Sequence, residues 1–247
     1  MSTRLDNSFH PGALIRHLVV LQATLGCAQL IAAQQAPPAP GVARFVVVLD
    51  AAHGGDDPGA RLANQAEKDY TLALSVKLRS LLAARGMAVV TTRESDAAVT
   101  PFARAEIANR VNAAACLSLH AALASSKTGP AVHLFVSSLP TAKDVRFAPW
   151  RSAQAGWITR STALAGVLNS ALTHASIAVT LGRAPLPAID SMACPAVAVE
   201  VAPQSRADAQ NAEGADDSGF EAQVAEALAA ALVEWRSGEG QPGDRRP

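Results

Sequence analysis

A run of apolar and β-branched residues opens the part of this chain that can build a core. It extends from Ala43 to Leu49 and reads Ala-Arg-Phe-Val-Val-Val-Leu. A run without polar alternation is typical of a strand buried on both faces, as in parallel sheets covered by helices. Residues 50–59 are rich in glycine, aspartate and proline and indicate a loop at the strand end. A helix is predicted from Lys68 to Arg85, because leucines recur at helical spacing and Gly86 follows.

The alternation of strand and helix patterns continues along the chain. Further strands are predicted at Met87–Thr92, Ala115–Leu119, Val132–Val136 and Ala196–Val201. Further helices are predicted from Thr100-Pro101, over Thr162–Thr173, and from Ser218, which forms a capping box with Glu221. This order predicts an α/β fold: a single domain, residues 43–236, whose mostly parallel central sheet is sandwiched by helices on both faces. The tail 237–247, rich in glycine, proline and charge, is predicted to be disordered.

The first forty residues differ in composition from the rest. Basic residues precede an apolar run from Leu18 to Ala33, and small residues and a proline-rich stretch follow. This order predicts a secretory signal peptide over 1–36 and a linker over 37–42, although a retained amphipathic helix is the alternative. The apolar run is too short and too interrupted for a membrane span, so we expect none in the mature chain. The protein is therefore expected to be exported and to be either periplasmic or secreted.

Charge and cysteine content exclude some functions and leave others open. Lys plus Arg number 21, as do Asp plus Glu, so a formal net charge of zero gives no basis for nucleic-acid binding. Of three cysteines, Cys27 would leave with the signal peptide. Cys116 and Cys194 are either buried free thiols or a pair joined in an oxidising compartment, and the sequence does not decide between these.

Polar side chains follow the predicted strands at positions that suit a metal. His53 and His120 come just after buried strands, and Glu67 opens the first helix. Ligands gather at the carboxyl ends of strands in such sheets, and two histidines with one carboxylate suit zinc, whose fourth position is left to water. Taken singly, each histidine can be an ordinary polar residue, and Glu67 can be an acid stabilised at a helix N-terminus.

A single acid, Glu200, interrupts the apolar stretch Pro195-Ala-Val-Ala-Val-Glu-Val-Ala. Burying a carboxylate without a partner costs several kcal/mol, even after the surrounding protein relaxes. We therefore expect Glu200 to face a cleft, a metal or a hydrogen-bond partner, which suits a general base and acid. Exposure at the strand end and a structural salt bridge are the alternatives.

Together these motifs resemble the zinc-dependent N-acetylmuramoyl-L-alanine amidases of the amidase-3 type, in the right order from about residue 43 to 235. The motifs are His53-Gly-Gly with Asp57-Pro-Gly, Glu67-Lys-Asp, Ser118-Leu-His120-Ala and Pro195-Ala-Val-Ala-Val-Glu200-Val. The segments Thr92-Arg93 with Asp96 and Arg104–Asn109 are also similar to connecting segments of that family.

The resemblance implies that His53, Glu67 and His120 bind Zn²⁺ and that Glu200 is the catalytic residue. It implies a peptidoglycan substrate, cut at the amide between N-acetylmuramic acid and L-alanine. Glu200 would take a proton from the zinc-activated water and return it to the leaving amine.

The sequence departs from the family pattern beside its site residues. Ala51-Ala52 stands where the family usually has Pro-Gly, Ala122 where it has Asn, and Ala202-Pro203 where it has Gly-Phe or similar. Ala52 and Ala122 support one alternative, an amidase-like peptidoglycan-binding protein with weak or no catalysis. A zinc peptidase with another amide substrate is a second alternative. The sequence identifies no regulatory partner protein, and residues 139–159 are either an occluding segment or a loop.

Overall fold

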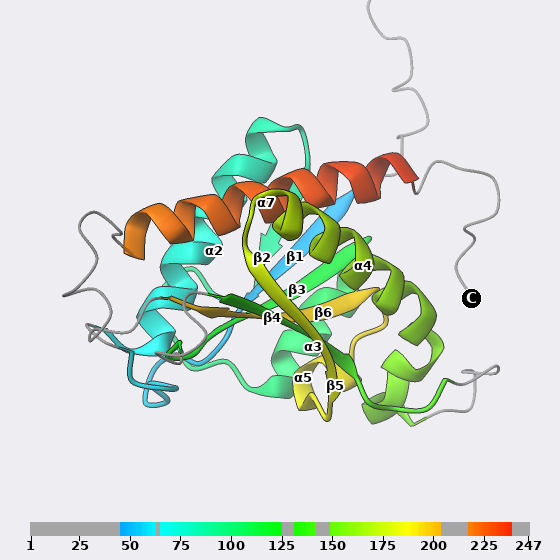
Figure 1. Ribbon diagram of the computed structural model, residues 1–247. Coiled ribbons are helices and arrows are strands. Elements are labelled where there is room, and N and C mark those ends of the chain that lie inside the picture. Colours follow the sequence, from blue (N-terminus) through cyan, green and yellow to red (C-terminus); the bar gives the residue numbers. More distant parts are fainter. Residues whose placement is uncertain (1–44, 63–64, 125–130, 142–148, 204–216, 239–247) are drawn as a thin grey trace, which may run out of the picture. The chain divides into compact units, whose positions relative to one another are not determined.

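A six-stranded sheet forms the centre of the computed structural model, which describes residues 45–62, 65–124, 131–141, 149–203 and 217–238 (Figure 1). The strands lie in the order β2-β1-β3-β6-β4-β5. Their bounds are β1 Val46–Ala51, β2 Ala88–Thr91, β3 Ala115–Ala121, β4 Ala131–Ser137, β5 Ala178–Ala184 and β6 Ala196–Ala202. The pairs of β1 with β2, β1 with β3, and β3 with β6 are parallel; β4 is antiparallel to β6 and parallel to β5. The predicted mostly parallel sheet is thus confirmed.

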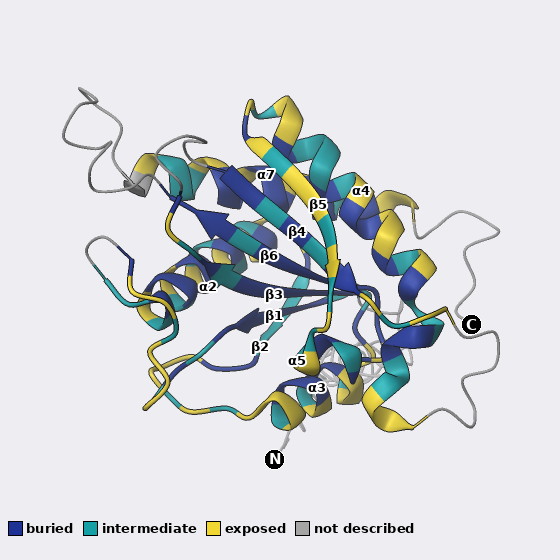
Figure 2. Cartoon of the chain, turned by 60° about the horizontal axis from the view of Figure 1, so that its bottom comes forward, coloured by how far each residue is buried: buried dark blue, intermediate teal, exposed yellow. Residues whose placement is uncertain are grey.

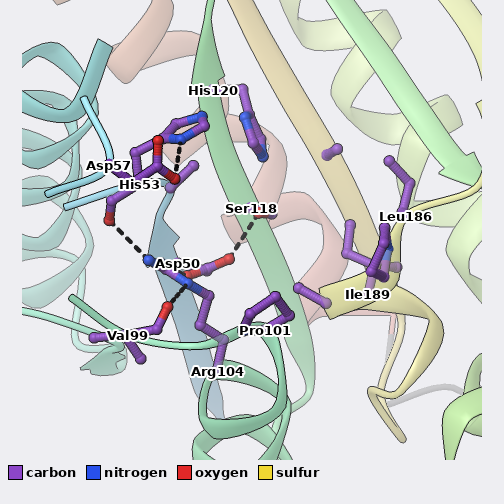
Figure 3. Close-up of a pocket in the computed structure, with 14 residues that line it drawn as sticks. Asp50, His53, Asp57, Val99, Pro101, Arg104, Ser118, His120, Leu186 and Ile189 are labelled. Carbon is purple, nitrogen blue, oxygen red and sulfur yellow. Dashed lines mark hydrogen bonds and ion pairs between the residues drawn. The ribbon is translucent and has the colours of Figure 1, made fainter. Parts of the chain in front are cut away.

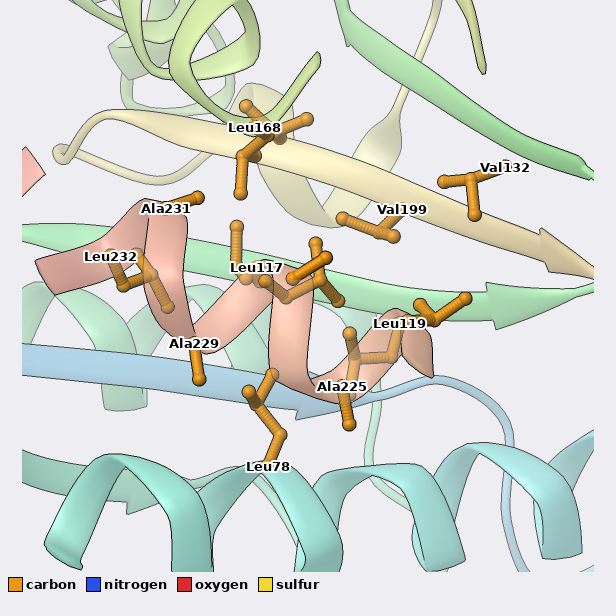
Figure 4. Close-up of a cluster of buried hydrophobic side chains, with 14 of the residues drawn as sticks. Leu78, Leu117, Leu119, Val132, Leu168, Val199, Ala225, Ala229, Ala231 and Leu232 are labelled. Carbon is orange, nitrogen blue, oxygen red and sulfur yellow. The ribbon is translucent and has the colours of Figure 1, made fainter. Parts of the chain in front are cut away.

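Helices cover both faces of this sheet, as predicted. They are α2 Glu67–Ala84, α3 Pro101–Arg110, α4 Ile158–His174, α5 Pro187–Asp190 and α7 Asp217–Gly238, with a 3₁₀ helix, η1, at Trp150–Gly156. One face packs against α2, α4 and α7 in the larger core, where Leu78, Leu117, Leu168 and Val199 are fully buried (Figure 4). Several alanines of α7 are buried in this core, and α7 packs directly against α2 and α4.

The opposite face is covered by α3 and α5 over the first halves of the central strands (Figure 2). Successive residues of a strand point to opposite faces, so Val197, Val199 and Val201 of β6 enter the larger core while Ala198 enters the smaller one. Beyond this smaller core the same face carries polar residues, among them His120 of β3 and Glu200 of β6. The layering therefore leaves the ends of β3 and β6 uncovered by α3 and α5.

Most predicted elements are confirmed, with shifted ends. α2 begins at Glu67, and the Thr100 side chain caps α3 by accepting a hydrogen bond of 3.2 Å from the Ala103 amide. β3 continues to Ala121, so His120 lies inside the strand rather than after it. α7 continues to Gly238, so the prediction that disorder begins at residue 237 was wrong for its first two residues. The signal peptide, the linker, residues 239–247 and the Ser218 side chain of the capping box lie outside the described part.

Three elements, η1, β5 and α5, were not predicted. β5 is an edge strand, and Thr180, Leu181 and Arg183 are exposed along it. Its sequence therefore lacks the alternation that burial of one face imposes on a strand. Pro185 follows β5 directly, and Pro187 opens the short helix α5.

Cys116 of β3 and Cys194, just before β6, form a disulfide whose Cα atoms are 6.5 Å apart. The structure thus has the paired alternative rather than two free thiols. Among the described residues, no helix combines the length and apolar composition that crossing a membrane requires.

Candidate metal centre and active site

The loop after β1 carries His53 in an unusual backbone conformation. His53 has φ 61°, and Gly59, six residues on, has φ 65°. A Cβ at Gly59 would lie 2.6 Å from Oε2 of Glu67 and 2.7 Å from Cδ2 of His53. Only glycine therefore lets this loop lie directly against both side chains. The positive φ of His53 is costly for a residue with a side chain and persists only where its surroundings hold it.

Two buried arginines hold this loop through its main-chain carbonyls. Arg104 donates from its terminal nitrogens to the carbonyl of Ala51 at 2.6 Å and to that of His53 at 2.7 Å. Arg93 donates to the carbonyl of Ala51 at 2.9 Å and to that of Ala52 at 3.0 Å. Burial is the main cause that lowers the pKa of Arg93, and the nearby Arg104 charge adds to it. The departure from the family pattern at Ala51-Ala52 therefore lies in a segment that is fixed by contacts to its backbone.

Asp50, the penultimate residue of β1, anchors the same network. It is 2% exposed and accepts hydrogen bonds from Arg104 at 2.6 Å and from the hydroxyls of Thr92 and Ser118, each at 2.7 Å. A buried carboxylate with these three donors satisfies the rule that a buried charge must be paired. Asp50 thus ties β1, β3 and α3 together directly beneath the His53 loop.

The three predicted metal ligands converge. Nε2 of His53 lies 3.1 Å from Oε2 of Glu67, and Nδ1 of His120 lies 3.0 Å from Oε1 of the same carboxylate. The three potential ligand atoms lie within 4.8 Å of one another. Residues from a loop, a helix start and a strand, far apart in sequence, thus present two imidazoles and one carboxylate to one point.

Glu67 is held in its charged form. It is 5% exposed, and it accepts hydrogen bonds from the amides of Ala60 at 2.8 Å and Ala121 at 3.1 Å. Burial, the largest single influence, opposes its ionisation, but the hydrogen bonds from His120, Ala60 and Ala121 outweigh it. The net result is a lowered pKa of Glu67. An ionised carboxylate is the form that binds a metal ion.

Asp57 orients the His53 ring from the other side. Its Oδ2 lies 2.8 Å from Nδ1 of His53, and its Oδ1 accepts a hydrogen bond of 3.1 Å from the Gly59 amide. The hydrogen bond with His53 and then that from Gly59 are the main causes that lower the pKa of Asp57. A carboxylate on one ring nitrogen fixes the proton there and leaves the other nitrogen, here Nε2 facing Glu67, as the ligand.

Glu200 lies on the strand next to His120. The two residues are register partners in the parallel pair of β3 and β6, and on its other side Glu200 pairs with His133 of β4. Because Val199 and Val201 enter the larger core, Glu200 points to the same face as His120. It is half-buried rather than buried. The structure records no hydrogen bond or ion pair to its carboxylate from the described residues, so a structural salt bridge is not its role among them.

A cavity of about 270 Å³ adjoins the convergent residues (Figure 3). His53, His120 and Asp57 line one end, and Asp50, Ser118 and Arg104 line it between β1, β3 and α3. The remaining wall is mostly apolar and comes from Val99, Pro101, Leu186, Pro187, Ala188 and Ile189. Two of the four predicted site residues thus line a cavity of a size that takes a small chemical group.

Sequence comparison places the chain among known proteins. The family model described as N-acetylmuramoyl-L-alanine amidase matches residues 47–234. The chain belongs to this family. The amidase AmiA of Escherichia coli (strain K12) is 40% identical over 77 residues, which are 31% of this chain and 27% of that protein. The germination-specific amidase of Bacillus subtilis (strain 168) is 41% identical over 56 residues, 23% of this chain and 24% of that protein. The chain thus matches about a quarter of the length of these curated relatives.

Solved structures of N-acetylmuramoyl-L-alanine amidases share the fold. The amidase AmiC2 of Nostoc punctiforme has a TM-score of 0.59 at 25% identity, covering 78% of this chain and 97% of that chain. The catalytic domain of CwlV from Bacillus (Paenibacillus) polymyxa has a TM-score of 0.59 at 24% identity, covering 78% and 98%. The predicted α/β fold class and the resemblance to the family are therefore confirmed.

The sequence analysis did not identify the residues that hold the proposed metal ligands and the His53 loop in place. Asp50 has the same signal as Glu200, a single acid at the end of an apolar run, and the cost of burying it would have marked it. Arg93, Arg104 and Asp57 lie in segments used only to recognise the family. Nothing local to them indicates which carbonyls or ring nitrogens they contact.

The other two departures from the amidase pattern lie where β3 and β6 end. The Ala122 amide donates to the carbonyl of Val201 at 3.0 Å, and the Ala124 amide donates to that of Pro203 at 3.3 Å. Main-chain pairing thus continues through both substituted positions.

Proposed function

We propose that this chain is a zinc-dependent hydrolase that cleaves the amide bond between N-acetylmuramic acid and L-alanine in peptidoglycan. The observation that carries the proposal is the convergence of His53, Glu67 and His120 in a chain of the amidase family. These three residues are the proposed zinc ligands, and Glu200 is the proposed catalytic residue.

The donor set fits zinc better than it fits magnesium or calcium. Two imidazole nitrogens and one carboxylate oxygen leave a fourth position open, which is the pattern of catalytic zinc sites. Magnesium and calcium prefer oxygen ligands alone. The lowered pKa of Glu67 favours the carboxylate that binds a metal ion, and Asp57 occupies Nδ1 of His53, so Nε2 is the nitrogen that faces Glu67. When bound, zinc would polarise the amide carbonyl and lower the pKa of water to about 7.

Glu200 is placed for the proton transfers of amide hydrolysis. It shares a face of the sheet with His120 and is its register partner on the adjacent strand. Half-buried and unpaired among the described residues, its carboxylate is available to take a proton from the attacking water. It would then give that proton to the nitrogen of the departing L-alanine, without which the amine is a poor leaving group.

Export follows as part of the same proposal. Peptidoglycan lies outside the cytoplasmic membrane, and the N-terminal order of basic, apolar and small residues is that of a secretory signal. The disulfide between Cys116 and Cys194 supports the proposal, because structural disulfides persist in oxidising compartments.

The test is to purify the chain, measure bound zinc, and follow release of stem peptides from peptidoglycan. The variant Glu200→Gln is expected to keep its zinc and to lose at least about 100-fold in turnover, the usual contribution of a general acid–base group. Glu94→Gln, which alters an exposed acid paired with Arg79, is the matched control and is expected to act like the unmodified chain.

Each alternative gives a different result. Zinc binding without release of stem peptide would indicate a peptidoglycan-binding protein. Cleavage of ordinary peptides but not of muropeptides would indicate a zinc peptidase. A chain that binds no zinc would contradict both enzyme assignments.

A further inference from the structure

Four polar side chains form a row across four neighbouring strands of the uncovered sheet face. His120 of β3 is the register partner of Glu200 of β6, Glu200 is the partner of His133 of β4, and His133 is the partner of Thr180 of β5. Figure 2 shows these strands side by side. The first residue of the row belongs to the proposed metal centre and the second is the proposed catalytic acid. The other two have no assigned role.

His133 faces the same side of the sheet as Glu200. Its strand neighbours Val132 and Leu134 are fully buried in the larger core, so the intervening residue points to the opposite face. Residues directly opposite each other in an antiparallel pair have Cβ atoms about 4.5–5.5 Å apart. A group bound beside the Glu200 carboxylate therefore lies within reach of the His133 ring.

Thr180 fixes the orientation of this ring. Its hydroxyl lies 2.6 Å from Nδ1 of His133, on the side away from Glu200. A hydroxyl can donate or accept, so this contact uses Nδ1 whichever nitrogen carries the proton. Nε2 has no recorded partner among the described residues. A half-buried imidazole with one nitrogen held and the other unused is suited to binding a polar ligand.

The chemistry of the proposed reaction determines which way the substrate lies along this row of side chains. The scissile carbonyl belongs at the metal centre, and the leaving nitrogen belongs beside Glu200, because Glu200 supplies its proton. The peptide attached to that nitrogen then continues away from the metal, over β4 and β5. The muramic acid half lies on the other side of the scissile bond and does not meet this part of the row.

We infer that His133, positioned by Thr180, binds the stem peptide through an acceptor oxygen that lies just beyond the scissile amide. The inference rests on the proposed amidase function and adds a peptide-binding residue to it. Nε2–H of His133 donates to a carbonyl or carboxylate oxygen of the leaving peptide while Thr180 accepts or donates at Nδ1. His133 thus selects substrates whose leaving amine carries a peptide.

The test compares two substrates cleaved at the same bond by the zinc-loaded full chain. N-acetylmuramoyl-L-alanyl-D-isoglutamine carries a peptide on the leaving amine, and N-acetylmuramoyl methylamide carries none. His133→Ala and Thr180→Val should lower kcat/KM for the first substrate about three- to tenfold, as loss of one hydrogen bond predicts, and leave the second unchanged. Thr180→Ser, which keeps the hydroxyl, should retain the value of the unmodified chain.

A binding measurement separates this inference from the amidase proposal. Calorimetry with the free peptide L-alanyl-γ-D-glutamyl-L-lysine should show about three- to tenfold weaker binding for His133→Ala and Thr180→Val, with zinc content unchanged. If the unmodified chain binds the peptide in this way but cleaves neither substrate, the amidase proposal fails and the inference stands.

Matched controls lie on the other side of the sheet. His174→Ala and Thr173→Val alter exposed residues near the end of α4, and both should leave binding and cleavage unchanged. Equal losses of kcat/KM with both substrates would overturn the inference, because they would place His133 at the reacting atoms instead. Absence of peptide binding, or unaltered binding by both variants, would also overturn it.

Discussion

Replacing Gly59 by alanine is expected to disrupt the proposed metal centre while leaving the fold intact. The added Cβ would lie 2.6 Å from Oε2 of Glu67 and 2.7 Å from Cδ2 of His53, and ordinary contacts of a Cβ begin at 3.4 Å. Two of the three proposed ligands must therefore move by several tenths of an ångström. Metal–ligand distances tolerate deviations of only about 0.2 Å, so zinc affinity should fall at least about tenfold.

The positive φ of Gly59 adds a separate cost, which a second variant isolates. Gly86, after α2, has φ 75°, and a Cβ there would meet nothing within 4 Å. Gly86→Ala should therefore lose only about 1–2 kcal/mol of stability. This is the cost of a left-handed backbone conformation for a residue that has a Cβ. Its zinc affinity should equal that of the unmodified chain.

Zinc affinity would be measured by competition with a chromogenic chelator, and stability by urea unfolding of the metal-free proteins. Gly59→Ala should lose both stability and affinity, whereas Gly86→Ala should lose stability alone. If Gly59→Ala bound zinc as tightly as Gly86→Ala, the contact of Gly59 with the ligands would have no role in shaping the site.

Three further predictions concern the groups around the proposed ligands. Asp57→Asn should weaken zinc binding about tenfold in the same competition assay, because an amide orients the His53 ring less strongly than a carboxylate; unchanged affinity would show that the contact is incidental. Folding lowers the pKa of Glu67, so the ionised Glu67 carboxylate stabilises the metal-free chain at pH values above the ordinary pKa of 4.5. This stabilisation is lost as the pH falls through the pKa that Glu67 has in the folded chain. Urea unfolding between pH 7 and pH 3 should therefore show a smaller acid-induced loss of stability for Glu67→Gln than for the unmodified chain, and equal losses would contradict this. Arg104→Met should cost about 3–5 kcal/mol of unfolding free energy, because Asp50 stays buried without its counter-charge; a cost below about 1 kcal/mol, typical of exposed ion pairs, would refute it.

The fold was predictable because its signals are local. The unbroken apolar run of β1 and the helical leucine spacing of α2 each lie within one segment, and together they specify a parallel sheet with helices on its faces. The reversed direction of β4 and β5 is not local. β4 pairs with β6, whose residues follow it by more than sixty positions, and a strand pattern reads the same in either direction.

The residues of the candidate site were likewise predictable only where their sequence signal is local. His53, His120 and Glu200 were marked by their places in or beside apolar strands, and the structure brings His53, Glu67 and His120 together. The residues that hold the loop could not be assigned, since Arg104 reaches the carbonyl of Ala51 across 53 positions. Such contacts depend on how the elements pack, and this sequence gives no local pattern for that.

The contacts of Arg93 and Arg104 have a consequence for how this site can change during evolution. Both arginines bind carbonyl groups at the end of β1 and in the loop that follows it, and every amino acid supplies such a group. Ala51 and Ala52 are buried, so substitutions that fit the same space can occur there without releasing His53, whereas loss of either arginine removes two of these hydrogen bonds. In diverging relatives, the presence of both arginines should therefore indicate an intact proposed metal centre better than the identity of the residues beside His53 does.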